Sequence, residues 1–335
     1  MPPPPAAAAS GVHAAPLTYR SWQPGIVQLR PLSFGDFLTV PFRGFRFARA
    51  TTLGGPLVMT LVSTAVGVLA GWLFLTDSQL GLLEPYPPMA GVEPLTIAVF
   101  VASIALWFAS DMLASAMVMV GVSRAVIGEK VSFGEAWGHV VRRLGALTVL
   151  YLATLGIGLL SVSPGLVVFF VGVASDQPWL GVLGLLVMLG VALPVGVVVA
   201  VYLPAARGAI VMERMGVATA VRRTRTLMKG RFWWTLLILV VCGLIVGAVS
   251  QVVTSVGQVA AFVGLAIAPE NPLLFAILFA VFYGLALIAS NVATYSFLGS
   301  VYALVYLDAR MRREGFDVDL AAYAEARHAA TAGAG

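Results

Sequence analysis

The chain has 335 residues, of which 60% are hydrophobic and only 10% are charged, and its mean hydropathy is +0.96. Soluble domains carry about 25% charged residues, so this composition indicates an integral membrane protein. The net charge of +5 does not by itself indicate nucleic-acid binding, because basic residues collect on the cytoplasmic side of membrane proteins. The single cysteine, Cys242, excludes a disulfide framework and a cysteine-based metal site.

Residues 1–21, which begin MPPPPAAAASGVHAAP, form a Pro/Ala-rich segment without a basic region or a continuous apolar run, so they do not resemble a signal peptide. We predict a disordered cytoplasmic tail there and a second cytoplasmic tail at 316–335. Between them, a membrane domain over 22–315 contains six windows long and apolar enough to cross a bilayer. The predicted spans are 53–75, 95–121, 145–174, 179–204, 233–267 and 274–306.

Two features modify these spans. Pro164 and Pro194 are expected to bend the third and fourth, because proline removes a helical hydrogen bond. The windows around the fifth and sixth spans are longer than one crossing requires. Long tilted helices explain this best, and a re-entrant segment at 251–258 is the alternative.

The distribution of charge predicts the topology. All 20 lysine and arginine residues lie within 20–49, 124–143, 207–231 and 310–327. The loops between these groups contain no basic residue, and their charged residues are all acidic: Asp77, Glu84, Glu93, Asp176 and Glu270. By the positive-inside rule, both termini are cytoplasmic and the number of spans is even. The scarcity of lysine beside abundant arginine and alanine is typical of GC-rich coding sequences and favours a bacterial cytoplasmic membrane.

A short motif recurs before the spans that lead outward. SFGDFLTVPFRGFR at 33–46 is matched by SFGEAWGHVVRRLG at 132–145, and 215–234 carries a degraded third copy. Ser33 with Asp36, and Ser132 with Glu135, have the spacing of a capping box. The sequence therefore predicts an all-α polytopic protein of three tandem units, each a cytoplasmic amphipathic helix followed by a hairpin of two transmembrane helices.

The basic residues of these amphipathic helices are predicted to contact anionic lipid headgroups of the cytoplasmic leaflet or a membrane-protein partner. Nucleic-acid binding is not expected, because no recognisable nucleic-acid-binding fold accompanies the charge. The predicted contact residues are Arg43, Arg46, Arg142, Arg143, Arg222, Arg223, Arg225 and Lys229.

Asp111 is the only charged residue well inside a predicted span. An aspartate there costs about 2.5 to 3.5 kcal/mol on insertion scales, so it needs a protein or water partner. No lysine or arginine lies within a predicted span, so the candidate partners are polar residues of the last two spans, Gln251, Asn291, Thr294 and Tyr295. Asp111 is either a proton or cation site or a hydrogen-bonded packing contact.

Two further patterns bear on function. GLIVG at 243–247 has the small-xxx-small spacing that lets two helices approach closely. His13, His139 and His328 are too far apart along the chain to suggest a metal cluster, and none of the common hydrolase or nucleotide-binding motifs is present. We therefore predict no catalytic activity, no metal and no cofactor.

Three stretches carry a family resemblance: WQPGIVQLRPLSFGD at 22–36, RFWWTLLIL at 231–239, and YALVYLDARMRREGFDVDL at 302–320. With them the chain resembles bacterial multipass proteins labelled as glycerophosphoryl diester phosphodiesterase membrane domain proteins. The residues that match the exit motif of that family are Tyr306, Asp308, Arg310, Arg312, Arg313, Glu314 and Gly315. Asp111 is not part of the family pattern.

The resemblance implies a membrane domain without its catalyst. Phosphodiesterases of that name carry their chemistry in a separate TIM barrel introduced by a His-Arg-Gly motif, and no soluble stretch here is long enough for such a barrel. We therefore expect a non-catalytic scaffold or accessory subunit that acts through its basic face. The alternative is a small-solute or lipid transporter with Asp111 as an intramembrane coupling residue.

Overall fold

The structure is a computed structural model that describes residues 25–27, 30–82, 91–267 and 271–315. The predicted tails at 1–21 and 316–335 lie outside these residues, as do Glu84 and Glu270. The described elements are all helical: α1 (Phe34–Phe47), a π-helical turn (Ala50–Gly54), α2 (Gly55–Thr76), α3 (Pro94–Val126), α4 (Phe133–Val141), α5 (Leu144–Ala174), α6 (Pro178–Met212), α7 (Val217–Met228), α8 (Phe232–Ile267) and α9 (Pro272–Glu314).

Six of these helices, α2, α3, α5, α6, α8 and α9, are long and apolar enough to cross a membrane. They pair along the chain into three hairpins, α2 with α3, α5 with α6, and α8 with α9. A short helix, α1, α4 or α7, precedes each hairpin. The predicted all-α polytopic fold of three such units is therefore confirmed.

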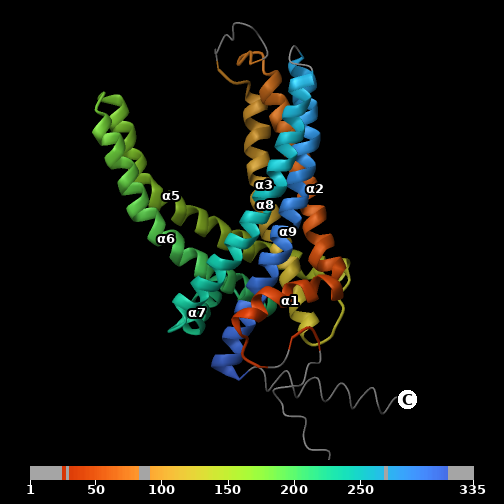
Figure 1. The fold of residues 1–335 in the computed structure, drawn as a ribbon. Helices are drawn as coiled ribbons and strands as arrows, with labels where there is room; N and C mark the ends of the chain where they lie inside the picture. The colour runs from red at the N-terminus through yellow and green to blue at the C-terminus, as the bar shows by residue number, and fades with distance from the viewer. Residues whose placement is uncertain (1–24, 28–29, 83–90, 268–270, 316–335) are drawn as a thin grey trace, which may run out of the picture.

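The three hairpins are not packed alike. Helices α2, α3, α8 and α9 run side by side as a bundle, while the α5–α6 hairpin diverges from it and curves along its length (Figure 1). Pro164 lies inside α5 and Pro194 inside α6, in keeping with the bending predicted for these two helices. The two helices approach closely at Gly165, where an added Cβ would lie 2.6 Å from the carbonyl oxygen of Gly184.

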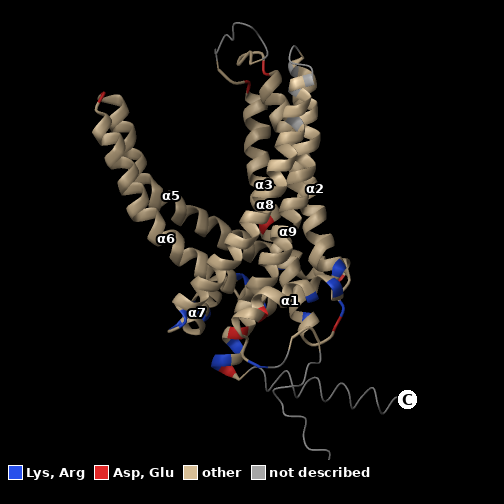
Figure 2. Cartoon of the chain, viewed as in Figure 1, with Lys and Arg blue, Asp and Glu red and all other residues tan. Residues whose placement is uncertain are grey.

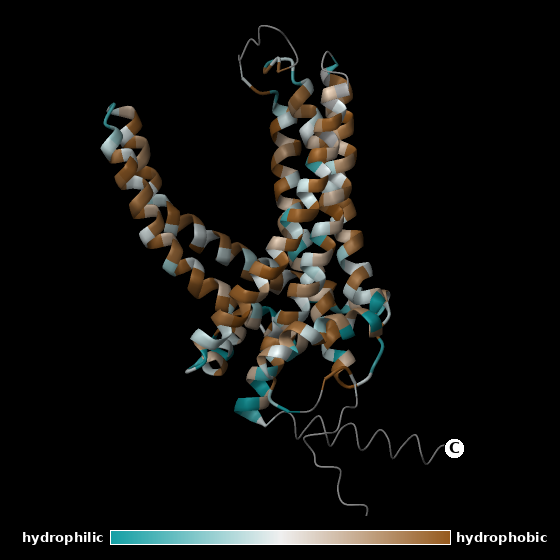
Figure 3. Ribbon diagram, viewed as in Figure 1, coloured by the Kyte–Doolittle hydropathy of each residue, from teal (hydrophilic) through white to brown (hydrophobic). Residues whose placement is uncertain are grey.

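Charge divides the molecule into two ends, as Figure 2 shows. Lysine and arginine gather around α1, α4, α7 and the last turns of α9, and we call this region the basic end. The loops at the opposite end carry Asp77, Glu93 and Asp176 among the described residues, and we call it the acidic end. Between the two ends the helices are predominantly hydrophobic (Figure 3).

The buried core lies in the half of the molecule nearest the basic end. It comprises the second half of α3 from Met112, the end of α6 from Val201, and α9 from Tyr295 to Met311, together with Phe37 of α1. These segments bury one another because α3, α6 and α9 converge there. The outer half of the α5–α6 hairpin, by contrast, exposes Leu159, Leu160 and other large apolar side chains, as lipid-facing helices do.

The short helices begin as the sequence predicts. The Ser132 hydroxyl accepts a hydrogen bond of 3.3 Å from the amide of Glu135, whose carboxylate accepts one of 2.9 Å from the amide of Ser132. At α1 the carboxylate of Asp36 accepts hydrogen bonds of 2.8 Å from both the amide and the hydroxyl of Ser33. These bonds satisfy amide groups that a helix start otherwise leaves unpaired.

Some helix lengths differ from the predicted spans. α8 is one continuous helix through 251–258, so the structure contains no re-entrant segment there. α6 continues past 204 to Met212, and α9 continues past 306 to Glu314. The glycines of GLIVG, Gly243 and Gly247, have no heavy atom of the described residues within 4 Å of an added Cβ, so no close helix packing occurs at them within the described part of the chain.

Candidate functional site

A polar cluster joins the three hairpins within the membrane-spanning region. The Asp111 carboxylate on α3 accepts a hydrogen bond of 2.7 Å from the Tyr151 hydroxyl on α5 and one of 3.3 Å from Arg207 on α6. Arg207 also donates to the Ser115 hydroxyl at 2.8 Å. Its guanidinium carbon lies 4.6 Å from the ring centroid of Tyr151 and 5.7 Å from that of Tyr302 on α9.

The two charges of this cluster differ in exposure. The side chain of Arg207 is 6% exposed, whereas that of Asp111 is 32% exposed. A buried charge is tolerated only when it is paired and hydrogen-bonded. Arg207 and Asp111 carry opposite charges and are hydrogen-bonded to each other, so each serves as the other's partner. The cluster therefore accounts for an aspartate at this depth as an ion pair that fastens the α5–α6 hairpin to α3.

The prediction that no arginine within a span could pair with Asp111 was wrong. It placed the end of the fourth span at 204, but α6 runs on to Met212 and carries Arg207 into the buried region. The neighbours of Arg207 along the chain are small or compact: Pro204, Ala205, Ala206 and Gly208. Without a bulky side chain there, α6 lies so close to α9 that an added Cβ at Gly208 would be 2.6 Å from the Tyr306 ring.

The four polar residues predicted as partners of Asp111 make no hydrogen bond with it. Tyr295 is buried in the core, with 8% of its surface exposed. Thr294 shares a hydrogen bond of 2.9 Å with Ser250, and Gln251 donates one of 3.4 Å to Ser255. Asn291 instead lines a groove between α2, α3 and α9. This part of the prediction was also wrong, because the partners of Asp111 come from the second hairpin.

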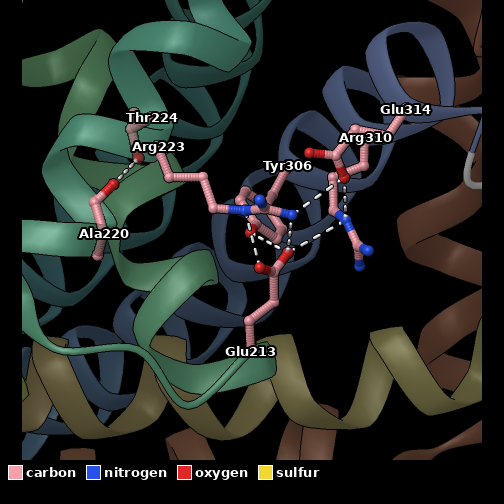
Figure 4. A network of polar contacts seen from close by, with 7 residues as sticks. All are labelled: Glu213, Ala220, Arg223, Thr224, Tyr306, Arg310 and Glu314. Atoms are coloured by element: carbon pink, nitrogen blue, oxygen red, sulfur yellow. Dashed lines mark hydrogen bonds and ion pairs between the residues drawn. The ribbon is translucent and has the colours of Figure 1, made fainter.

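At the basic end, the exit motif residues are engaged in ion pairs. Glu213, at the end of α6, lies 2.8 Å from Arg223 of α7 and 3.1 Å from Arg310 of α9 (Figure 4). Glu314 completes the network, at 3.0 Å from Arg223 and 3.1 Å from Arg310, and the Tyr306 hydroxyl donates to Glu213. Burial lowers the pKa of Arg223, but the bond to Tyr306 and the charges of Glu213 and Glu314 outweigh it, so the net shift is upward.

Asp308 forms a second such centre. Its carboxylate, which is 4% exposed, accepts hydrogen bonds from the Leu32 amide at 2.8 Å, Arg231 at 3.0 Å and Arg312 at 2.9 Å. Arg312 also donates to the Leu32 carbonyl at 2.8 Å. The segment before α1 is thereby held against the end of α9, 276 residues further along the chain.

The remaining exit-motif residues end the helix. Arg313 donates to the carbonyl of Lys229, and Gly315 adopts the left-handed conformation, with φ of 65°, that commonly terminates helices. The motif that carries the family resemblance thus has a structural role, which is to join α9 to α6, α7, α8 and the segment before α1.

The predicted lipid or partner contacts fall into two groups. Arg223 is occupied by the two glutamates, and Arg143 is only half-exposed. The others are exposed at the basic end: Arg43, Arg46, Arg142, Arg222, Arg225 and Lys229. No group of three or more potential metal ligands occurs among the described residues.

The residues that sequence reasoning missed are Ser115, Tyr151, Arg207, Glu213 and Arg231. The one available signal was Arg207, an isolated arginine after a proline and two alanines at the end of a long apolar run. Comparison with known proteins found no matching family model, no matching curated protein and no matching solved structure. The family resemblance therefore stays a prediction.

Proposed function

We propose that this multipass protein is a non-catalytic scaffold or accessory subunit that contacts anionic lipid headgroups through its basic end. The proposal places it in a bacterial cytoplasmic membrane with both termini in the cytoplasm, as the charge asymmetry favours. The observation that carries it is the gathering of exposed arginines on three separate short helices at one end of the molecule. The resemblance to stand-alone membrane domains supports the same function.

The energetics favour contact with anionic lipids. Each lysine or arginine near an anionic membrane surface contributes about 1 kcal/mol, which corresponds to about a fivefold enrichment of anionic lipid for each contact. Exposed aromatic residues accompany these charges, among them Phe42 and Trp233, which are 57% and 76% exposed. Aromatic side chains of this kind favour the level of the lipid headgroups.

The test compares lipids retained by the protein. Wild-type protein is reconstituted in nanodiscs of phosphatidylglycerol and phosphatidylcholine, released with mild detergent and examined by native mass spectrometry. The test variant carries glutamine at Arg43, Arg46, Arg222 and Arg225, and the control variant carries lysine at the same positions. We expect phosphatidylglycerol to be enriched in the wild type and the lysine variant and not in the glutamine variant. Equal enrichment in all three would contradict lipid contact at this end.

The same experiment, done on protein extracted from its own host membrane, distinguishes lipid from protein contact. A stoichiometric protein partner lost on glutamine substitution would identify the accessory-subunit form of the proposal. Retention of that partner in the glutamine variant would place its contact elsewhere.

Transport with Asp111 as coupling residue is the second candidate, and one observation favours it. The Asp111 side chain remains 32% exposed although it lies far from both ends of α3. Its ion pair with Arg207 already explains why an aspartate lies at this depth. Transport is therefore the second candidate rather than the first. Flux of a solute that survives the pair of substitutions Asp111→Asn and Arg207→Met in folded protein would exclude Asp111 from coupling.

A further inference from the structure

One face of α8 carries polar side chains where this membrane-spanning helix is exposed. Gln251, Ser255 and Gln258 lie along it at spacings of four and three residues, which place them on the same side of a helix. Gln251 is exposed and Gln258 is half-exposed. Leu244, two turns earlier on the same side, is 68% exposed. We call this surface the glutamine face.

The glutamine face lies deep within the apolar part of α8. Exposed apolar side chains extend along the helix from Leu237 to Val263, as expected for a helix in contact with lipid. Gln251 is near the middle of this stretch, about 21 Å from Leu237 and about 18 Å from Val263 along the helix axis. An amide at this position is therefore surrounded by hydrocarbon unless another protein segment covers it.

The two glutamines are incompletely hydrogen-bonded within the described part of the chain. The amide nitrogen of Gln251 donates to the Ser255 hydroxyl at 3.4 Å, which is longer than the usual range of about 2.7 to 3.2 Å. The side-chain oxygen of Gln251 and the side-chain amide of Gln258 have no hydrogen bond there. Because lipid chains offer no hydrogen-bonding groups, these amides favour a protein partner.

The glutamine face is also open to close approach by another helix. Gly247 lies one turn before Gln251 on this face, and an added Cβ there would meet no heavy atom of the described residues within 4 Å. α8 packs on α9 through another side, where an added Cβ at Gly257 would be 2.9 Å from the carbonyl oxygen of Phe282. Small residues beside polar ones are typical of contacts between membrane helices. The face thus suits a contact that α8 does not make within the described chain.

A second copy of this chain matches the glutamine face. All copies cross the membrane in the same orientation, so two copies hold Gln251 at the same depth, whereas an unrelated helix would need its own polar group there. A glutamine amide both donates and accepts, so it is complementary to itself across a twofold axis. Gly247, Gln251 and Ser255 follow the four-residue spacing along which two parallel helices cross closely, at about −40°.

We propose that two copies of the chain form a parallel dimer through the glutamine face, in which the Gln251 amides hydrogen-bond to each other. This inference does not depend on the function proposed for the basic end.

Purified protein in liposomes tests the proposal, because any association must then be between copies of this chain. Cys242 is replaced by alanine and Thr226, at the basic end, by cysteine. Pools labelled there with a donor or an acceptor dye are reconstituted together over a wide range of lipid-to-protein ratios. We expect energy transfer that saturates with protein density, which gives the dissociation constant of the dimer.

Three variants connect this dimer to the glutamine face. Gln251→Leu removes the paired amides and should raise the dissociation constant about tenfold, while the folded monomer, in which Gln251 is exposed, stays unchanged. Gly247→Leu blocks the close approach and should also raise the constant about tenfold. Gly190→Leu on α6 is the matched control, because an added Cβ at Gly190 also has open space, and it should leave the constant unchanged.

Cysteine cross-linking locates the contact on α8. In protein with Cys242 replaced by alanine, Leu244→Cys places a thiol on the glutamine face. Val252→Cys is the control, because Val252 is 65% exposed, close to the 68% of Leu244, but lies about 100° around the helix from Gln251. Oxidation in liposomes should give a disulfide-linked dimer of the Leu244→Cys variant and not of the Val252→Cys variant.

Three results would overturn the proposal. The first is protein that stays monomeric at every density, because the glutamines would then face lipid or a different protein. The second is a dimer whose dissociation constant Gln251→Leu leaves unchanged. The third is equal cross-linking of the Leu244→Cys and Val252→Cys variants, which would place the contact on another part of the surface.

Discussion

The ion pair between Asp111 and Arg207 should be essential to the attachment of the α5–α6 hairpin. Asp111→Asn retains an oxygen that accepts from Tyr151 but removes the charge, which leaves the 6% exposed Arg207 uncompensated. Breaking a buried pair from one side costs about 3 to 5 kcal/mol, and the 32% exposure of Asp111 places the loss at about 3 kcal/mol. Arg207→Met should cost less, about 2 kcal/mol, because the remaining carboxylate is partly exposed.

The double variant decides whether the two residues act on each other. Independent losses would sum to about 5 kcal/mol, whereas Asp111→Asn combined with Arg207→Met leaves no unpaired charge and should cost no more than about 2 kcal/mol. Equilibrium unfolding in mixed micelles, followed by circular dichroism, measures each value. Gln251→Leu, an exposed polar residue on α8, is the control and should change the unfolding free energy by less than about 0.5 kcal/mol. Additive losses in the double variant would refute the pairing.

Three further substitutions test the packing and the caps. Asp308→Asn should lower the unfolding free energy by about 3 kcal/mol and expose the segment before α1 to protease, because three donors lose a buried carboxylate. Gly208→Ala should cost at least about 2 kcal/mol, since its Cβ would overlap a buried ring, whereas Gly190→Ala, with open space, should be neutral or stabilising in the same unfolding assay. Ser132→Ala should accelerate amide hydrogen exchange in α4 by about fivefold, because it removes a cap that contributes about 1 kcal/mol.

The sequence correctly predicted those features that depend on the residue types within a short stretch of chain. Ser132 and Glu135 predicted a helix start, and the apolar windows predicted the crossing helices. The clusters of basic residues predicted which elements lie together at one end of the molecule. The charge of each loop can be read from the sequence without knowing the fold. These features depend on neighbours within a few residues or on composition alone.

The contacts between hairpins could not be predicted in the same way. Arg207 lies 96 residues from Asp111, and it can meet that carboxylate because α6 ends later than its apolar window suggests. Asp308 binds Leu32 across 276 residues for a similar reason, since nothing in the local sequence specifies which segment approaches the end of α9. The groove at Asn291 likewise depends on how α2 and α3 pack against α9.

The claim that the basic end faces the cytoplasm is tested most directly by labelling single cysteines in intact cells. Cys242 is buried and can be replaced by alanine, so that a cysteine at Ser175, at the acidic end, or at Thr226, at the basic end, is the sole target. A membrane-impermeant maleimide should label the Ser175→Cys variant in intact cells and the Thr226→Cys variant only after the membrane is opened. Labelling of Thr226→Cys in intact cells would contradict the account, because the exposed arginines would then face away from the cytoplasmic leaflet.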